Sequence, residues 1–72
     1  MNRHDPLFPR AREARIRYLD ADFQVLEEGD FVRCAVTGQP IKVEDLRYWS
    51  VERQEPYLDA ASAFRVYMDG FR

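Results

Sequence analysis

The chain has 72 residues, a mass of 8.6 kDa and a formal net charge of −2, which together predict one small domain. A single cysteine excludes an internal disulfide, and one cysteine with one histidine excludes a four-ligand zinc site within one chain. No apolar run approaches the roughly 18 residues of a membrane span. The N-terminal segment has no signal-peptide core, so we expect a cytoplasmic protein without membrane partners.

The N-terminal residues 1–12 are predicted to form a flexible basic arm, because Pro6 and Pro9 disfavour helix around them. The single small domain is expected over residues 13–72. Within it, residues 14–18 alternate small or apolar side chains with arginine, which predicts a half-buried strand, and residues 23–25 resume the alternation after a turn. Gly29 stands in a second turn, where a positive φ is accessible to it.

The middle of the chain predicts further strands. Residues 31–36 are mostly apolar and are expected to form a central strand, and the segment Thr37–Pro40 is expected to turn the chain. Shorter strands are predicted over residues 41–43 and 47–51. Short strands at this close spacing indicate a small antiparallel meander of three to five strands.

The C-terminal segment predicts a helix of about ten residues, with Asp59 as its N-cap and Gly70 leaving it in a left-handed conformation. Its apolar residues recur at helical spacing and are Ala60, Ala61, Phe64, Tyr67, Met68 and Phe71. Ser62, Arg65 and Asp69 are expected on the opposite face. A helix this short is marginal alone, so the apolar stripe is expected to pack on the sheet or on a second subunit. The predicted fold class is α+β.

The small size also predicts association. A domain of this length buries only about 60% of the surface that its unfolded chain exposes, and such chains commonly add a disulfide, a metal or a partner. Ten aromatic side chains are more than a core of this size easily encloses. We therefore expect a homodimer, with an exchanged helix or terminal strand hinged at residues 52–59 as one way to form it. The basic residues before 18 and the acidic residues at 18–30 neutralise each other either between subunits or, as we favour, within the fold.

The most specific stretch is the turn at Cys34, Thr37, Gly38 and Pro40, which resembles half of a zinc knuckle. Thr37 stands where the second cysteine of a knuckle would be. Two chains together offer two Cys34 and two His4, so a degenerate zinc ribbon that binds metal across a dimer is one alternative. The interpretation that we prefer is a structural turn with a buried Cys34 and no cofactor.

Arg47, Tyr48, Trp49 and Arg53 form a possible binding surface. Alternation places Tyr48 and Trp49 on opposite faces of a strand, which leaves one ring exposed. Exposed rings beside arginine stack on bases, so a single-stranded nucleic-acid or ribosome-associated binder is a second alternative. The isoelectric point of about 5.3 argues against nucleic acid, and a non-enzymatic protein-interaction module remains our preferred function.

Enzymatic activity is the least supported class. The acidic residues after Asp20 do not match a calcium loop, because Val25 and Phe31 occupy its sixth and twelfth positions. Glu52 and Glu55 form a carboxylate pair with no predicted pocket around it. No nucleophile, base and orienting group occur together, so no catalytic residue is assigned.

Three segments carry a family resemblance: RIRYLD at residues 15–20, GDFVRCAVTGQPI at 29–41 and LRYWSVERQE at 46–55. Over residues 13–70 the chain resembles the uncharacterised alphaproteobacterial family catalogued as domain of unknown function 2093. The resemblance implies a bacterial, cytosolic, single-domain protein in which the CAVTGQPI turn is a family feature. It implies no activity, cofactor or partner.

Overall fold

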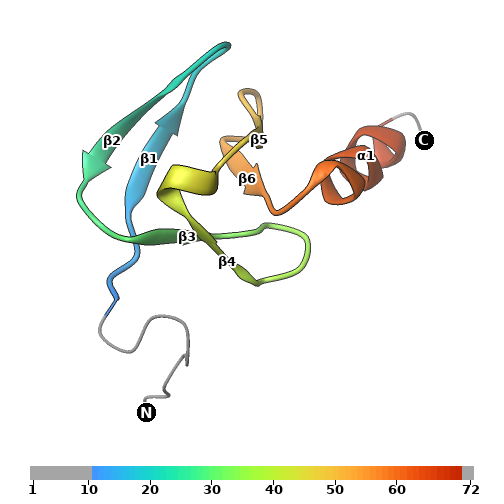
Figure 1. Ribbon diagram of the computed structural model, residues 1–72. Coiled ribbons are helices and arrows are strands. Elements are labelled where there is room, and N and C mark those ends of the chain that lie inside the picture. Colours follow the sequence, from blue (N-terminus) through green and yellow to red (C-terminus); the bar gives the residue numbers. More distant parts are fainter. Residues whose placement is uncertain (1–10, 71–72) are drawn as a thin grey trace.

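The computed structural model describes residues 11–70, and within them six short strands precede one C-terminal helix (Figure 1). This arrangement confirms the predicted α+β class. The predicted arm lies almost wholly outside the described residues. In chain order the elements are β1 (Arg15–Tyr18), β2 (Phe23–Glu27), β3 (Phe31–Arg33), β4 (Pro40–Lys42), the 3₁₀ turn η1 (Val43–Asp45), β5 (Tyr48–Ser50), β6 (Glu55–Tyr57) and α1 (Ala60–Asp69).

The strands pair as three separate antiparallel hairpins, β1–β2, β3–β4 and β5–β6, instead of the single meander predicted. Four of the six strands have only three residues, and two of these contain a proline, Pro40 in β4 and Pro56 in β6. Proline has no N–H with which to extend a ladder. The prediction omitted β6 because Glu55-Pro56-Tyr57 has no strand pattern.

Isolated backbone contacts join the hairpins. The N–H of Ala14 donates to the Phe31 carbonyl at 2.7 Å, and the N–H of Asp30 donates to the Arg12 carbonyl at 2.8 Å. Gly29 permits this approach, since a Cβ there would lie 2.4 Å from the Ala14 nitrogen. Gly29 does not use the positive φ that is accessible to glycine. Among the described glycines only Gly38 has one, at +77°.

The third predicted strand is shorter than expected, because the chain leaves β3 at Cys34. The N–H of Cys34 donates to the Gln39 carbonyl and the N–H of Gly38 donates to the Cys34 carbonyl, both at 2.9 Å. These bonds close a tight turn that the apolar run at residues 34–36 does not reveal. The turn reaches β6, where the Pro56 carbonyl accepts from the N–H of Ala35 at 3.0 Å.

The hydrophobic core lies between the hairpins and consists of six buried residues, to which half-buried Ile16, Phe23 and Trp49 add their contacts. Residues from β1, the β3–β4 hairpin and the loop before β5 contribute to it: Ala14, Tyr18, Val32, Cys34, Ile41 and Leu46. Within residues 11–70 no helix has the length and apolar character needed to cross a bilayer.

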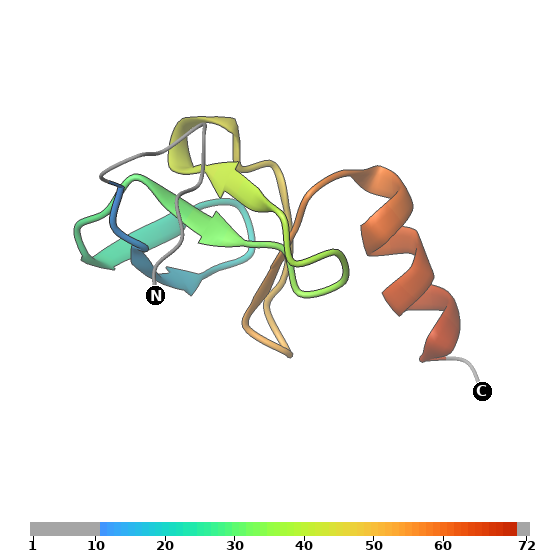
Figure 2. The same cartoon turned by 90° about the horizontal axis from the view of Figure 1, so that it is seen from below.

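The helix begins as predicted, because the Asp59 Oδ1 atom accepts from the N–H of Ser62 at 2.8 Å. Gly70, however, stays right-handed, with φ at −67°. Ser62, which was predicted on the face opposite the apolar stripe, is buried. Phe64 and Tyr67 of the stripe are exposed, so the stripe does not pack on the sheet. α1 lies beside β5 and β6 and stands at one end of the molecule (Figure 2).

Candidate functional site

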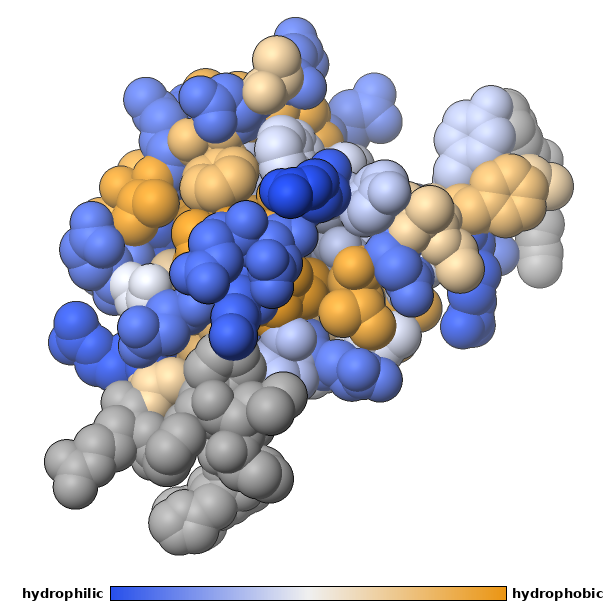
Figure 3. Space-filling model, viewed as in Figure 1, coloured by the Kyte–Doolittle hydropathy of each residue, from blue (hydrophilic) through white to orange (hydrophobic). Residues whose placement is uncertain are grey.

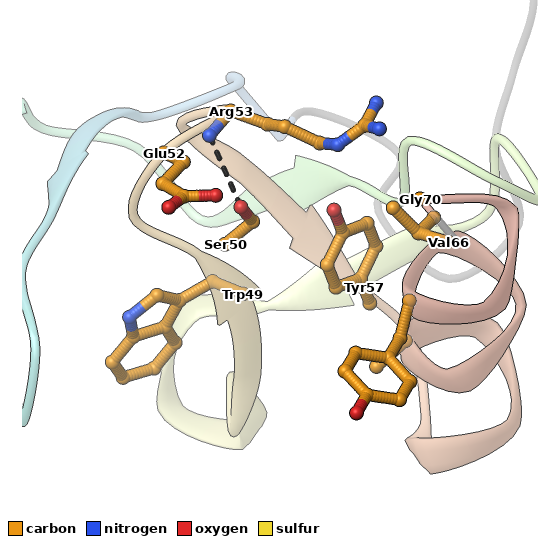
Figure 4. A pocket seen from close by; sticks show the side chains of 9 residues that line it. Trp49, Ser50, Glu52, Arg53, Tyr57, Val66 and Gly70 are labelled. Atoms are coloured by element: carbon orange, nitrogen blue, oxygen red, sulfur yellow. Dashed lines mark hydrogen bonds between the residues drawn. The ribbon is translucent and has the colours of Figure 1, made fainter. Parts of the chain in front are cut away.

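A groove with a volume of about 380 Å³ lies between the β5–β6 hairpin and α1 (Figure 4). Two of the four residues predicted to form a binding surface, Trp49 and Arg53, line it. Arg47 and Tyr48 do not. The hairpin contributes Trp49, Ser50, Glu52, Arg53 and Tyr57, and the helix end contributes Ala63, Val66, Tyr67 and Gly70.

The turn between β5 and β6 sets one wall of this groove. The backbone N–H of Arg53 donates to the Ser50 hydroxyl at 3.0 Å, and the Gln54 side chain donates to the Val51 carbonyl at 2.7 Å. Gln54 itself has a positive φ of 54°. The turn therefore uses only the backbone of Arg53, and the guanidinium is left for other contacts.

Gln54 also fastens this hairpin to the end of β1. Its Oε1 atom accepts from the N–H of Tyr18 at 2.9 Å, and its Nε2 atom donates to the Tyr18 carbonyl at 2.8 Å. The amide thus pairs with Tyr18 as a neighbouring strand would. This role of Gln54 was not predicted from the sequence, because a polar residue in a turn carries no periodic signal.

Trp49 packs against β1 and β2 instead of standing free. Its indole N–H donates to the Leu19 carbonyl at 2.7 Å. The ring centroid lies 6.0 Å from that of Tyr18 and 5.6 Å, edge to face, from that of Phe23. Tyr48, on the other side of β5, is 41% exposed, so the two rings do point to opposite faces.

The polar groups of the groove differ in their partners. The Tyr57 hydroxyl donates to Glu55 Oε1 at 3.2 Å, so one oxygen of that carboxylate is engaged. Burial and the Glu55 carboxylate raise the pKa of Tyr57. Among the described residues no ion pair involves Arg53 or Glu52; the one that is formed joins Arg15 to Glu27 at 3.9 Å.

The Cys34 turn is built around the sulfur. Cys34 is 3% exposed, and its Sγ atom accepts from the backbone N–H groups of Leu58 at 3.2 Å and of Val36 and Thr37 at 3.4 Å. Burial raises the pKa of the thiol, but the hydrogen bonds, from Thr37 first, outweigh burial and lower it. The bond from the Leu58 N–H to the Cys34 sulfur therefore ties this turn to the segment that leads into α1.

A metal centre is not assembled by the described part of the chain, where no three His, Cys, Asp or Glu residues gather. His4, which the zinc alternative requires, lies outside it. The acidic residues near Asp20 are exposed, and Asp22 Oδ1 accepts from the N–H of Phe23 at 2.8 Å. The Arg15–Glu27 contact on paired strands is an example of neutralisation within the fold.

A second surface, the α1 face, consists of Phe64, Tyr67 and Met68, which are 59%, 60% and 45% exposed. The rings of Phe64 and Tyr67 lie side by side, with centroids 6.3 Å apart. Figure 3 shows apolar side chains reaching the surface at the helix end of the molecule. These residues belong to the stripe that was predicted to pack on the sheet or on a second subunit, and they do not pack on the sheet.

A family model described as "Uncharacterized protein conserved in bacteria (DUF2093)" matches residues 25–65, which are more than half of the chain. The match spans the Cys34 turn, the β5–β6 hairpin and the first half of α1. No curated protein and no solved structure matches the chain.

Proposed function

The chain belongs to this family, whose description assigns no activity, and we propose that the protein is a non-enzymatic, cytoplasmic interaction module that forms a homodimer through the α1 face. The observation that carries the proposal is the exposure of Phe64, Tyr67 and Met68 on one side of a ten-residue helix. A contiguous apolar patch on so small a domain marks an interaction site.

A second copy is a fitting partner, because a helix face with apolar residues at i, i+3 and i+4 is complementary to itself about a two-fold axis. The three side chains expose roughly 300 Å² per copy, taking about 200 Å² for each full side chain. Burying two such faces is worth about 15 kcal/mol before costs. Association costs about 4–15 kcal/mol, which leaves a net gain of about 0–11 kcal/mol, a range that includes the roughly 8 kcal/mol of a micromolar dimer.

Sedimentation equilibrium tests the dimer. The expected result is a monomer–dimer equilibrium for the wild type and a monomer for the double variant Phe64→Ala/Met68→Ala. Both variant residues are exposed, so the helical circular dichroism should persist. Arg65→Ala, on the same helix and also exposed, is the matched control and should dimerise normally. A wild-type monomer at high micromolar concentration, or an unchanged double variant, contradicts the proposal.

Binding to single-stranded nucleic acid is the second candidate, supported by the exposed Tyr48 beside the exposed Arg47. The engaged indole N–H of Trp49 and its contacts with Tyr18 and Phe23 favour the protein interface instead. Titration of the wild type with oligothymidylate at low salt, followed by fluorescence anisotropy of the labelled strand, decides between them. Binding that Tyr48→Ala abolishes would support this candidate, and an unchanged anisotropy would remove it.

A further inference from the structure

The groove between the β5–β6 hairpin and α1 combines mainly apolar walls with a few charged side chains. Its walls are mainly apolar or aromatic, from Trp49 and Tyr57 on the hairpin and from Val66 and Tyr67 on the helix. Pockets that are mostly apolar, with a few polar groups at fixed points, are the usual form of small-molecule sites. The volume of about 380 Å³ is near the small end of such sites and suits one ring with a short substituent.

One cation lines this groove. The Arg53 side chain extends from the hairpin turn toward the Gly70 end of α1 and passes the hydroxyl end of Tyr57 (Figure 4). The Glu52 carboxylate, which is the other charged group of the lining, lies beside Ser50 and away from the Gly70 end of α1 (Figure 4). Among the described residues the guanidinium of Arg53 has no ion-pair partner. Its five N–H donors therefore remain for a planar anion at the rim.

We propose that this groove binds an aromatic ring that carries a carboxylate on a short chain, with the carboxylate on Arg53 and the ring against Val66 and Tyr67 of the helix wall. The guanidinium fork matches a carboxylate with two parallel hydrogen bonds. The ring replaces water on the aromatic walls, where offset or edge contacts add to the burial. A free aromatic acid and the C-terminal aromatic residue of a peptide share this chemistry.

The test is a titration of the full chain with N-acetylphenylalanine and with its primary amide, which lacks the charge. Amide chemical shifts of isotope-labelled protein report binding by the hairpin and α1. We expect the acid to bind in the millimolar range or tighter, and the amide about tenfold more weakly, because a charge-assisted bond is lost.

Arg53→Ala should remove the preference for the acid. The variant keeps the turn, because the Ser50 contact uses the backbone N–H of Arg53. Arg47→Ala, on the same hairpin but outside the groove, is the matched control and should bind as the wild type does. Equal binding of acid and amide, unchanged binding by Arg53→Ala, or no shifts at about 10 mM ligand would each overturn the proposal.

The source of the ligand follows from a second pair of probes, 3-phenylpropionate and a tetrapeptide ending in phenylalanine. Tighter binding of the first indicates a free acid, and tighter binding of the second indicates a peptide terminus. Failure of both overturns the site. Sedimentation reports the dimer, and Arg53→Ala tests the groove without changing the α1 face, of which only Tyr67 also lines the groove.

Discussion

Gln54 is the side chain whose loss should most weaken the fold. It makes three hydrogen bonds of 2.7–2.9 Å, two with the Tyr18 backbone and one with the Val51 carbonyl. At about 1 kcal/mol for each bond, Gln54→Ala should cost about 3 kcal/mol. That is more than half of the roughly 5 kcal/mol that a weakly stable domain has, and it should lower Tm by roughly 12–24 °C.

Urea unfolding followed by the fluorescence of Trp49 measures this loss, and two further variants separate its causes. Gln54→Glu keeps the acceptor for the Tyr18 N–H but removes both donors, so it should be as unstable as Gln54→Ala at neutral pH. Gln54→Gly removes the same bonds but relieves the positive φ of 54°, so it should recover about 1 kcal/mol relative to alanine. A loss below about 0.5 kcal/mol for Gln54→Ala, or wild-type stability for Gln54→Glu, would refute the reasoning.

Three other predictions concern stability. Cys34→Ala should cost about 2 kcal/mol, because three backbone N–H groups lose their sulfur acceptor, and Cys34→Ser should cost less in the same urea assay. Gly29→Ala should abolish folding, as judged by circular dichroism, because the added Cβ would overlap backbone atoms of residues 13 and 14. Gly38→Ala should lower the free energy of unfolding by only about 1 kcal/mol, because the space around Gly38 is open and only its φ of +77° is unfavourable for alanine. Burial, aided by Glu13, raises the pKa of Tyr18 to about 12. Tyr18 therefore contributes its full stabilisation below pH 10, the pKa of tyrosine in the unfolded chain, and this contribution declines between pH 10 and pH 12. Thermal melts should show a smaller fall of Tm over this pH range in Tyr18→Phe than in the wild type.

Local patterns in the sequence predicted those parts of the fold that depend on neighbouring residues. The alternation over residues 14–18 gave β1, and Asp59 with the following apolar spacing gave the helix and its cap. The missed features depend on residues distant in sequence. Gln54 contacts Tyr18 across 36 positions, and Leu58 reaches the Cys34 sulfur across 24. No local pattern records such bonds.

The candidate site divides in the same way. Tyr48 and Trp49 were correctly placed on opposite faces of β5 by alternation. The groove could not be predicted, because it depends on which side of α1 meets the hairpin. A hydrophobic stripe specifies that a helix face avoids water, but it does not specify what covers that face. Small residues such as Ser62 and Ala63 allow the closer approach, and that side therefore faces β5 and β6.

The orientation of α1 connects the size of the chain with its exposed surface. Turning the stripe inward would bury Phe64, Tyr67 and Met68 against a hairpin whose strands have three residues each, too small a platform for three large side chains. The observed packing buries Ser62 instead and leaves the α1 face outside. In the proposed dimer a second copy covers the exposed aromatic residues of α1, so dimer formation and thermal stability should rise together with protein concentration.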